Sequence, residues 1–403
     1  MGTAASIDIY SPDWYVDGEF HGAFAELREH DPVHWQDMPD EPGYWAVMRH
    51  RDVVTVARNP EVYSAWLGGV VLEDLTPERL EGMRNMMLSM DPPHHMAYRR
   101  PLAPHFVPNV IGTMEQQIRA ITREILDEAA ERGEVDLVND VCGPLPPRVI
   151  AQIMGLPRED TGKLQRWAEL SVSSQDPDIV GDSYGGGDAG MEMAMYAIAL
   201  AGERRPLPRT DDIFSLLLDT QFEDGRTMND IELGSFFVQL VTAGNDTTKT
   251  MMSTGTYELL RHPDQLQALR DDPALLQGAV EEMLRYCNPL HYFRRTATQD
   301  TELGGKQIKA GDKVAMMYTS ANRDAEVFED PQRFDIRRSP NPHLTFGIGG
   351  HFCLGVHLAR MEARIFFEEL LSTFSTIELA GEPARVRSNL NNAFKRMPIR
   401  VTR

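Results

Sequence analysis

The spacing of apolar residues along the chain predicts a mostly helical protein. In several long stretches apolar side chains recur every three or four positions, which is the repeat of an amphipathic helix. Residues such as Pro, Gly and Asn stand at or just beyond several of their ends, as expected at helix boundaries. The stretches are residues 20–30, 51–58, 108–132, 146–154, 212–219, 230–261, 273–286 and 354–374.

Short runs of β-branched and aromatic residues predict a small β region beside these helices. Residues 33–35 and 44–48 are separated by a Pro/Gly turn and suit a hairpin. The same character returns later, in residues 292–298, 301–303 and 313–318. Because no linker, repeat or sharp change of composition divides the chain, we expect residues 1–403 to form one domain, mainly α with a small β region.

The longest predicted helix has an unusual middle. Capped by Asn229 or Asp230 and running to residue 261, it would be about 48 Å long at 1.5 Å per residue. Its segment from Ala243 to Thr248 is rich in poor helix formers. We expect the hydrogen-bond ladder to open near Gly244, because such irregularities often mark ligand sites.

Two side chains in this segment carry chemistry. Asp246 and Thr247 offer a carboxyl and a hydroxyl, which together would suit a proton relay. Gly244 would leave room for a ligand against the helix. The alternative is a kinked helix in which threonine hydroxyls bond back to carbonyls one turn earlier.

A glycine-rich loop with a single cysteine precedes the last predicted helix. This Cys353 loop, residues 346–355, has the sequence Phe-Gly-Ile-Gly-Gly-His-Phe-Cys-Leu-Gly. Glycines permit turns in which amide N–H groups point at a sulfur and stabilise a thiolate, whereas an ordinary cysteine, with a pKa of about 8.5, is mostly a thiol at neutral pH. The following helix N-terminus also favours negative charge. We interpret Cys353 as a ligand of haem iron; the alternative is a turn with an inert, buried cysteine.

Composition excludes several classes of protein. Forty basic and 61 acidic residues give a net charge of −21, which would repel nucleic acid and anionic lipid. The three cysteines are far apart and odd in number, which argues against a disulfide framework. The chain also has no CxxC pair, which argues against a zinc site. The longest nearly apolar run, residues 191–201, is too short to span a bilayer, and the first residues lack signal-peptide order. We therefore expect a soluble, cytoplasmic protein.

Two further pairs of charged residues stand at helical spacing. His95 and Arg99 follow Pro92 and Pro93, and on one helix face they could hold a carboxylate. Taken alone, such a pair is more often a solvated helix face. Glu282 and Arg285 make an i, i+3 pair of a kind that contributes only about 0–1 kcal/mol on a surface.

These features together resemble the cytochrome P-450 family of haem-thiolate monooxygenases, from about Ile7 to the end of the chain. The Cys353 loop matches the family's Phe-Gly-x-Gly-x-His-x-Cys-x-Gly haem-ligand pattern without a mismatch. Three further segments match family patterns in the same order along the chain. His95 and Arg99 match the propionate-binding helix, residues 243–248 match the oxygen-binding groove, and Glu282 and Arg285 match the Glu-x-x-Arg pair. The implied fold is the family's triangular, mostly helical body, with haem between the long distal helix and the Cys353 loop.

The resemblance assigns roles to individual residues. Cys353 would ligate the iron of haem b within a loop shaped by Phe346, Gly347, Gly349 and Gly355. The haem propionates would be held by a set of basic residues, His95, Arg99, Arg295 and His351. The family's structural triad would comprise Glu282, Arg285 and Arg338, with Arg337 as the less favoured third member.

The implied reaction inserts one oxygen atom of O2 into a C–H bond or a double bond. By the resemblance, Ala243 and Gly244 would leave space for O2, while Asp246 and Thr247 would deliver protons, with Thr248 in the same groove. No GxGxxG motif or cysteine cluster is present, so electrons would come from a separate reductase chain. The resemblance to soluble bacterial members of the family implies a small acidic ferredoxin with an NAD(P)H-dependent reductase. A basic patch would dock this partner, unless its members pair only with propionates and neighbouring carboxylates; it comprises Arg99, Arg100, Arg360 and Arg364.

The candidate substrate pocket is apolar and aromatic, which favours a hydrophobic substrate. Its predicted residues are Trp66, Leu67, Val70, Val71, Phe236, Phe237, Leu240, Leu290, His291, Tyr292 and Phe293. Residues 87–93 and 387–390 are similar to those of relatives that oxidise terpenoids, steroids and branched lipids. An aromatic or xenobiotic substrate is the alternative, and a haem-binding sensor without turnover is a second class of function.

Overall fold

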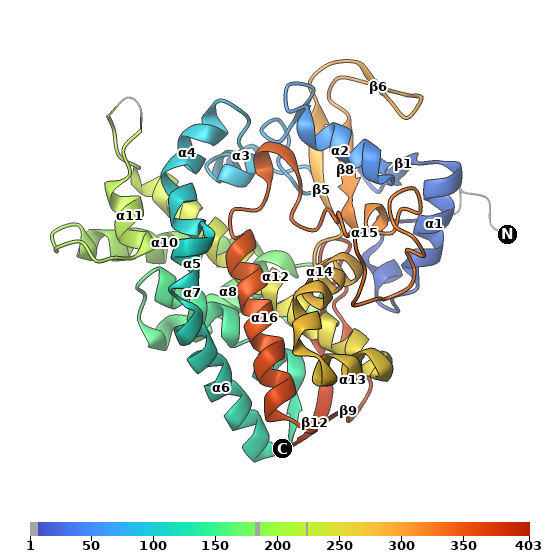
Figure 1. Cartoon of the computed structure of the whole chain (residues 1–403). Helices are drawn as coiled ribbons and strands as arrows, with labels where there is room; N and C mark the ends of the chain where they lie inside the picture. The colour runs from blue at the N-terminus through green and yellow to red at the C-terminus, as the bar shows by residue number, and fades with distance from the viewer. Residues whose placement is uncertain (1–6, 182–185, 223–224) are drawn as a thin grey trace.

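The computed structural model describes residues 7–181, 186–222 and 225–403. It is a broad body that narrows toward the C-terminus, so that its outline is triangular (Figure 1). This confirms the predicted fold class, a mainly α protein with small β-sheets. The α-helices are α1 (Phe20–His30), α2 (His50–Arg58), α3 (Pro77–Arg84), α4 (His94–Leu102), α5 (Pro108–Gly112), α6 (Glu115–Arg132), α7 (Leu145–Ile153), α8 (Thr161–Val172), α9 (Pro177–Val180), α10 (Gly186–Arg204), α11 (Ile213–Asp219), α12 (Asp230–Arg261), α13 (Pro263–Asp271), α14 (Leu276–Cys287), α15 (Tyr318–Ala321) and α16 (Val356–Thr373).

The strands form small sheets at two ends of the body. The largest sheet has the order β1-β2-β8-β5-β3, in which β1 and β2 form the predicted antiparallel hairpin and β2 pairs in parallel with β8. A second sheet, β4-β12-β9, joins the C-terminal strand to the segment after α6. The strands are β1 (Val33–Met38), β2 (Glu41–Val47), β3 (Tyr63–Ser64), β4 (Glu134–Asp136), β5 (Tyr292–Ala297), β6 (Thr301–Leu303), β7 (Lys306–Ile308), β8 (Lys313–Met317), β9 (Thr376–Leu379), β10 (Ala384–Arg385), β11 (Phe394–Arg396) and β12 (Pro398–Thr402).

Alternation along β8 divides the core around the larger sheet. Ala315 and Met317 belong to one apolar cluster, whereas Val314 and Met316 belong to another. Successive side chains of a strand point to opposite faces, so the sheet is covered on both sides. The largest cluster lies among the helices and includes residues of α12, α14 and α16.

Helix α12 crosses the middle of the molecule (Figure 1). Its start is fixed by a capping box, in which the Asn229 side chain accepts from the Glu232 N–H and the Glu232 carboxylate accepts from the Asn229 N–H. It contacts α7, α8, α10, α14 and α16. A helix packed on so many sides presents different faces to the core and to a ligand site.

The predicted opening of α12 near Gly244 is wrong. The helix is continuous from Asp230 to Arg261, and the Thr247 hydroxyl donates to the carbonyl oxygen of Ala243 at 2.7 Å. This is the back-bonding that the alternative interpretation described. Packing against neighbouring helices outweighs the low intrinsic propensity of the segment, because tertiary contacts supply most of the stability of a helix.

The predicted helix over residues 108–132 is also divided. It forms α5 and α6, and the break lies at Thr113, whose hydroxyl donates to the carbonyl oxygen of Val110 at 2.6 Å. Gly112 and Thr113 are weak helix formers, so a local side-chain bond competes successfully there. Within the described residues, no helix is both long and apolar enough to cross a membrane.

Candidate active site

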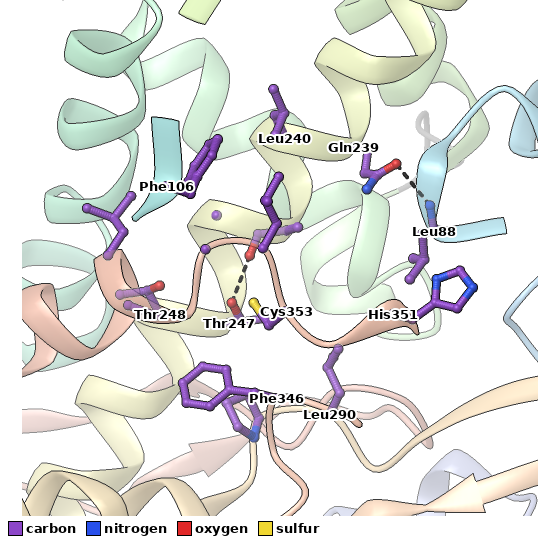
Figure 2. A pocket seen from close by; sticks show the side chains of 18 of the residues that line it. Leu88, Phe106, Gln239, Leu240, Thr247, Thr248, Leu290, Phe346, His351 and Cys353 are labelled. Atoms are coloured by element: carbon purple, nitrogen blue, oxygen red, sulfur yellow. Dashed lines mark hydrogen bonds between the residues drawn. The ribbon is translucent and has the colours of Figure 1, made fainter. Parts of the chain in front are cut away.

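A cavity of about 260 Å³ lies between α12 and the Cys353 loop. Figure 2 shows Cys353 and Thr247, from these two elements, at the same cavity. Further walls come from α4, α7 and the start of β5. The cavity therefore collects residues that are far apart in sequence, in the place where the resemblance puts haem.

The conformation of the Cys353 loop explains its glycines. Gly347 and Gly349 have φ angles of +69° and +77°, a region that side chains other than hydrogen rarely tolerate. A Cβ atom on Gly349 would also lie 2.8 Å from the carbonyl oxygen of Ala57 in α2. The loop closes on itself where the Cys353 N–H donates to the Phe346 carbonyl oxygen at 2.9 Å.

The sulfur of Cys353 lies in a mixed electrostatic environment. Burial raises the pKa of its thiol, whereas a hydrogen bond from the Gly355 N–H and the charges of Arg99 and Arg360 act to lower it. Arg360 is also placed by a cation–π contact, with its guanidinium carbon 4.8 Å from the ring centroid of Phe346. A metal ion at the cavity would favour the thiolate further.

Four basic residues surround one side of the cavity. His95 and Arg99 come from α4, Arg295 from β5 and His351 from the Cys353 loop, and the rings of the two histidines have centroids 4.3 Å apart. Neither ring nitrogen of His95 has a partner, and the Nε2 of His351 has none among the described residues. The polar contacts of the two arginines are with carbonyl oxygens, Arg99 with Phe352 and Arg295 with Arg294.

The titration of the two histidines reflects this crowding. Burial, together with the charges of Arg99 and Arg295, lowers the pKa of His95 to about 4. Burial and the same arginines lower the pKa of His351 to about 2. At neutral pH the two histidines are therefore uncharged, and the cations beside the cavity are Arg99 and the buried Arg295. A buried cation needs an anionic partner, and within the part of the chain described no carboxylate pairs with either arginine. The two propionates of haem would supply such partners, and Cys353 a thiolate ligand, so the residues present fit haem.

Glu282 organises the segment that leads into the Cys353 loop. Arg285 donates to both of its carboxylate oxygens at 2.7 and 2.8 Å, and the Nε of Arg338 donates at 3.1 Å. Arg338, rather than Arg337, is the residue that reaches it. Arg285 and Arg338 also donate to carbonyl oxygens of the segment, including those of Asn322, Pro331, Arg333, Glu329 and Asp330. The triad therefore fixes the path of residues 322–342.

The predicted oxygen-activation residues separate into two groups. Ala243, Gly244, Thr247 and Thr248 line the cavity. Asp246 does not: its carboxylate pairs with Lys249 at 2.7 Å and accepts from the Asn391 side chain at 2.6 Å. The structure thus brings Thr247 to the cavity and turns Asp246 away from it.

Lys249 extends this buried network to another helix. Its ammonium lies 3.5 Å from the carboxylate of Glu169 in α8. Burial opposes the charge of Lys249, but the carboxylates of Asp246 and Glu169 outweigh it and raise its pKa. Sequence reasoning missed Lys249, Glu169 and Asn391; only the i, i+3 spacing of Asp246 and Lys249 could have signalled part of the network.

Three of the predicted substrate-pocket residues line the cavity: Leu240, Leu290 and Phe293. The others do not line it, and they are Trp66, Leu67, Val70, Val71, Phe236, Phe237, His291 and Tyr292. Contacts with other parts of the chain explain where most of these residues lie. Phe236 and Phe237 pack within the helical core, against Tyr98 and Tyr196.

Along β5, side-chain alternation separates neighbours. Phe293 reaches the cavity, whereas Tyr292, on the opposite face, lies in a core cluster. His291 precedes the strand, and its ring bonds to the Thr319 hydroxyl at 3.0 Å. The backbone of residues 70–73 is held by Arg294, whose N–H donates to the Val70 carbonyl and whose guanidinium donates to the carbonyls of the next three residues. Trp66 lies under Arg84, whose guanidinium carbon is 5.2 Å from the centroid of the Trp66 ring.

Several cavity residues were not predicted from the sequence. They include Leu88, Phe106, Ile150 and Gln239 (Figure 2 labels three of them). Gln239 could have been found from its position one turn before Ala243, but the others come from segments whose approach depends on the tertiary fold.

The predicted basic patch is largely paired with carboxylates. Arg360 donates twice to Glu281 at 2.7 Å, and Arg364 contacts Glu115 and Glu368 at 3.0 and 2.8 Å. For these two arginines the structure therefore shows the alternative, pairing with neighbouring carboxylates.

Comparison with known proteins agrees with the geometry of the cavity. The family model of cytochrome P450 matches residues 200–398. A steroid C26-monooxygenase of Mycolicibacterium smegmatis is 37% identical over 94% of this chain and 90% of its own length. A methyl-branched lipid omega-hydroxylase of Mycobacterium tuberculosis is 36% identical over 98% of this chain and 94% of its own length.

A solved structure is similar over its whole length. The cytochrome P450 CYP268A2 of Mycobacterium marinum, in complex with pseudoionone, has a TM-score of 0.92 and 36% identity, and the match covers 99% of each chain. Sequence identity at this level over nearly complete chains establishes common family membership. The chain belongs to the cytochrome P450 family of monooxygenases.

Proposed function

We propose that this monooxygenase inserts one oxygen atom of O2 into a hydrophobic small molecule of the terpenoid, steroid or methyl-branched lipid class. The observation that carries the proposal is the cavity, whose wall includes Leu240, Leu290 and Phe293. Apolar walls favour a substrate that is mostly hydrocarbon. The names of the relatives, a steroid and a branched-lipid hydroxylase, support this class.

In this proposal Cys353 ligates the iron of haem b, and the four basic residues bind its propionates. Haem with a thiolate ligand would supply the binding and activation of O2 and the transfer of one oxygen atom, with electrons from the redox partner. Arg99 and Arg295 would provide permanent charges, and a propionate beside His95 or His351 would raise the histidine's pKa from its present low value. Phe346, Gly347, Gly349 and Gly355 would shape the loop around the sulfur.

Thr247 is the cavity hydroxyl best placed to handle a proton. Its Oγ1 holds its proton toward the Ala243 carbonyl, and rotation of the hydroxyl would present that proton to the cavity. Ala243 and Gly244 would leave room for O2, with Thr248 beside them. Asp246 would take part only after its carboxylate leaves Lys249 and Asn391, so its access to the cavity depends on breaking that network.

Electrons would come from an iron-sulfur ferredoxin and an NAD(P)H-dependent reductase. We propose that the ferredoxin docks on the Cys353 side, near Arg99 and Arg100. We also propose that residues 1–403 act as one domain, because the cavity draws on elements from α4 to α16. Three free cysteines agree with a cytoplasmic location.

The proposal is tested by reconstituting the holoprotein with a bacterial ferredoxin, its reductase and NADH. We expect NADH consumption to rise when a methyl-branched lipid or a steroid is added, with one oxygen atom in the product coming from 18O2. A purely aromatic panel serves as the comparison. Product formation from aromatic compounds alone would favour the alternative substrate class, and absence of any oxygenated product would contradict the proposal.

A further inference from the structure

One polar side chain in the apolar part of the cavity has no role in holding haem or handling O2. Gln239 lies on α12, one turn before Ala243, and lines the cavity beside Leu88 and Leu240. At 1.5 Å per residue it is displaced by about 6 Å along the helix from Ala243 and about 12 Å from Thr247. It therefore lies beyond the oxygen-binding segment, where the rest of a substrate would extend.

The orientation of the Gln239 amide is fixed by its neighbour. The backbone N–H of Leu88 donates to Gln239 Oε1 at 3.2 Å, as Figure 2 shows. A backbone N–H can only donate, so the amide oxygen must face Leu88 and the NH2 group must face the other way. This contact links the segment before α4 to α12 and holds the side chain in place.

The NH2 group of Gln239 is left without a protein acceptor. No carbonyl, carboxylate or hydroxyl of the described residues accepts from its Nε2. Gln239 is half-buried and its NH2 group is accessible, so an oxygen atom of a ligand in the cavity could accept a hydrogen bond from it. The donor is also preorganised, because the Leu88 contact already orders the side chain.

We propose that Gln239 recognises a carbonyl or hydroxyl oxygen on an otherwise hydrocarbon substrate. This inference rests on the proposed function and adds a polar anchor to its hydrophobic substrate class. With the oxygen held at Gln239, the carbon to be oxidised lies about 6–12 Å away along α12, over Ala243 and Thr247. The enzyme would therefore oxidise its substrate at a position remote from the existing oxygen function.

Ligand binding to the ferric holoprotein tests this role without turnover. The probes are pseudoionone, a ketone, and the hydrocarbon of the same skeleton in which a methylene replaces the carbonyl. Binding is followed by the Soret shift that accompanies displacement of the axial water. We expect the unaltered protein to bind the ketone about 2- to 10-fold more tightly than the hydrocarbon, the range of one neutral hydrogen bond.

Two variants separate the donor from the packing of the side chain. Gln239→Glu keeps an acceptor for the Leu88 N–H and removes the NH2 group. Gln239→Met keeps the length of the side chain and removes both the acceptor and the NH2 group. We expect the preference for the ketone to disappear in both variants. Leu240→Ala is the matched control, in which both probes should weaken together and their ratio should be unchanged.

The outcomes distinguish this inference from the function on which it rests. If both probes bind and their ratio is the same in the unaltered protein and the two Gln239 variants, the inference is wrong and the hydrophobic substrate class stands. If neither probe binds to the unaltered protein, the proposed substrate class and the inference both fail. Loss of the ratio in the Leu240 control would also contradict a specific role for Gln239.

Discussion

The Cys353 loop and the middle of α12 lie on two sides of one cavity, and they obey different structural rules. In the loop, neighbouring residues act together: glycines with positive φ and the Cys353 N–H bond to Phe346 fix the backbone around the sulfur. In α12, the neighbours Asp246 and Thr247 meet different surroundings, a buried ion pair and the cavity. Successive residues of a helix point about 100° apart, so adjacency in sequence does not place two side chains in one site.

The two regions show which kind of sequence motif specifies the geometry of a site. A motif made of backbone conformation specifies its own geometry, because the required φ angles admit few residues. A motif made of helix side chains specifies only a face, and what covers that face comes from other segments. The experiments below test the two regions against each other.

The largest effect is expected from the loop itself. Cys353→Ser should abolish the red-shifted Soret band of the ferrous carbonyl complex and reduce product formation below detection, because an alcohol is a poor replacement for a thiolate. Absorption spectra of the carbonyl complex measure this directly. Cys142→Ala, a change at a buried cysteine outside the cavity, should keep the band; persistence of the band in Cys353→Ser would remove Cys353 as the ligand.

The support of the loop should be nearly as sensitive. Glu282→Gln leaves the buried guanidinium groups of Arg285 and Arg338 without their carboxylate, which we expect to cost about 3–5 kcal/mol of unfolding free energy. Denaturant unfolding of the holoprotein measures the loss. The neighbouring Glu281→Gln is the control. Glu281 pairs with Arg360 and His343, but its carboxylate and Arg360 are both partly exposed, so the cost should be smaller. Equal costs for both variants would show that the triad does not hold the loop.

On the helix side, the back face of α12 should affect stability. Asp246→Asn keeps an oxygen that accepts from the Asn391 side chain, but it leaves Lys249 with only the more distant carboxylate of Glu169. We therefore expect the free energy of unfolding to fall by about 2 kcal/mol. Thermal and denaturant unfolding measure it. Combining this change with Lys249→Met should restore part of the loss, because the buried charge is then removed; no restoration would mean that the pair is not coupled.

A buried histidine outside both regions provides a pH reference. Burial, and then the charge of Arg385, lower the pKa of His291 to about 3 from an ordinary 6.5. Between these values the unfolded chain binds the extra proton, so stability should fall on acidification from pH 6.5, by at most about 1.4 kcal/mol per pH unit. His291→Gln should flatten this part of the stability profile. A profile that is unchanged by the substitution would contradict the assignment.

The smallest stability effect is expected at the cavity face of α12. Thr247→Ala removes only a local bond to the Ala243 carbonyl, so unfolding free energy should change by no more than about 0.5 kcal/mol. Hydrogen peroxide released per NADH should nevertheless rise several-fold, because the hydroxyl proposed to handle the proton is lost. Normal coupling in this variant would exclude Thr247 from proton handling and would erase the contrast with Asp246.

Sequence reasoning was most successful where local chemistry decides structure. The ends of α12, the hairpin of β1 and β2 and the shape of the Cys353 loop follow from caps, turns and glycines. It failed where packing decides. The run from Ala243 to Thr248 suggested an opened helix, but the surrounding helices keep α12 regular, and Trp66 lies away from the cavity under Arg84.

By itself, the sequence determined the class of the fold, the shape of the Cys353 loop and the basic residues that gather beside it. These depend on residue types that few other roles tolerate, such as a lone cysteine among glycines with positive φ. The tertiary structure decided which side chains share the cavity: it brought in Gln239 and Leu88, and it paired Asp246 with Lys249 and Asn391. The physical reason is that a side chain's surroundings are set by segments distant in the chain, whose approach no local pattern encodes.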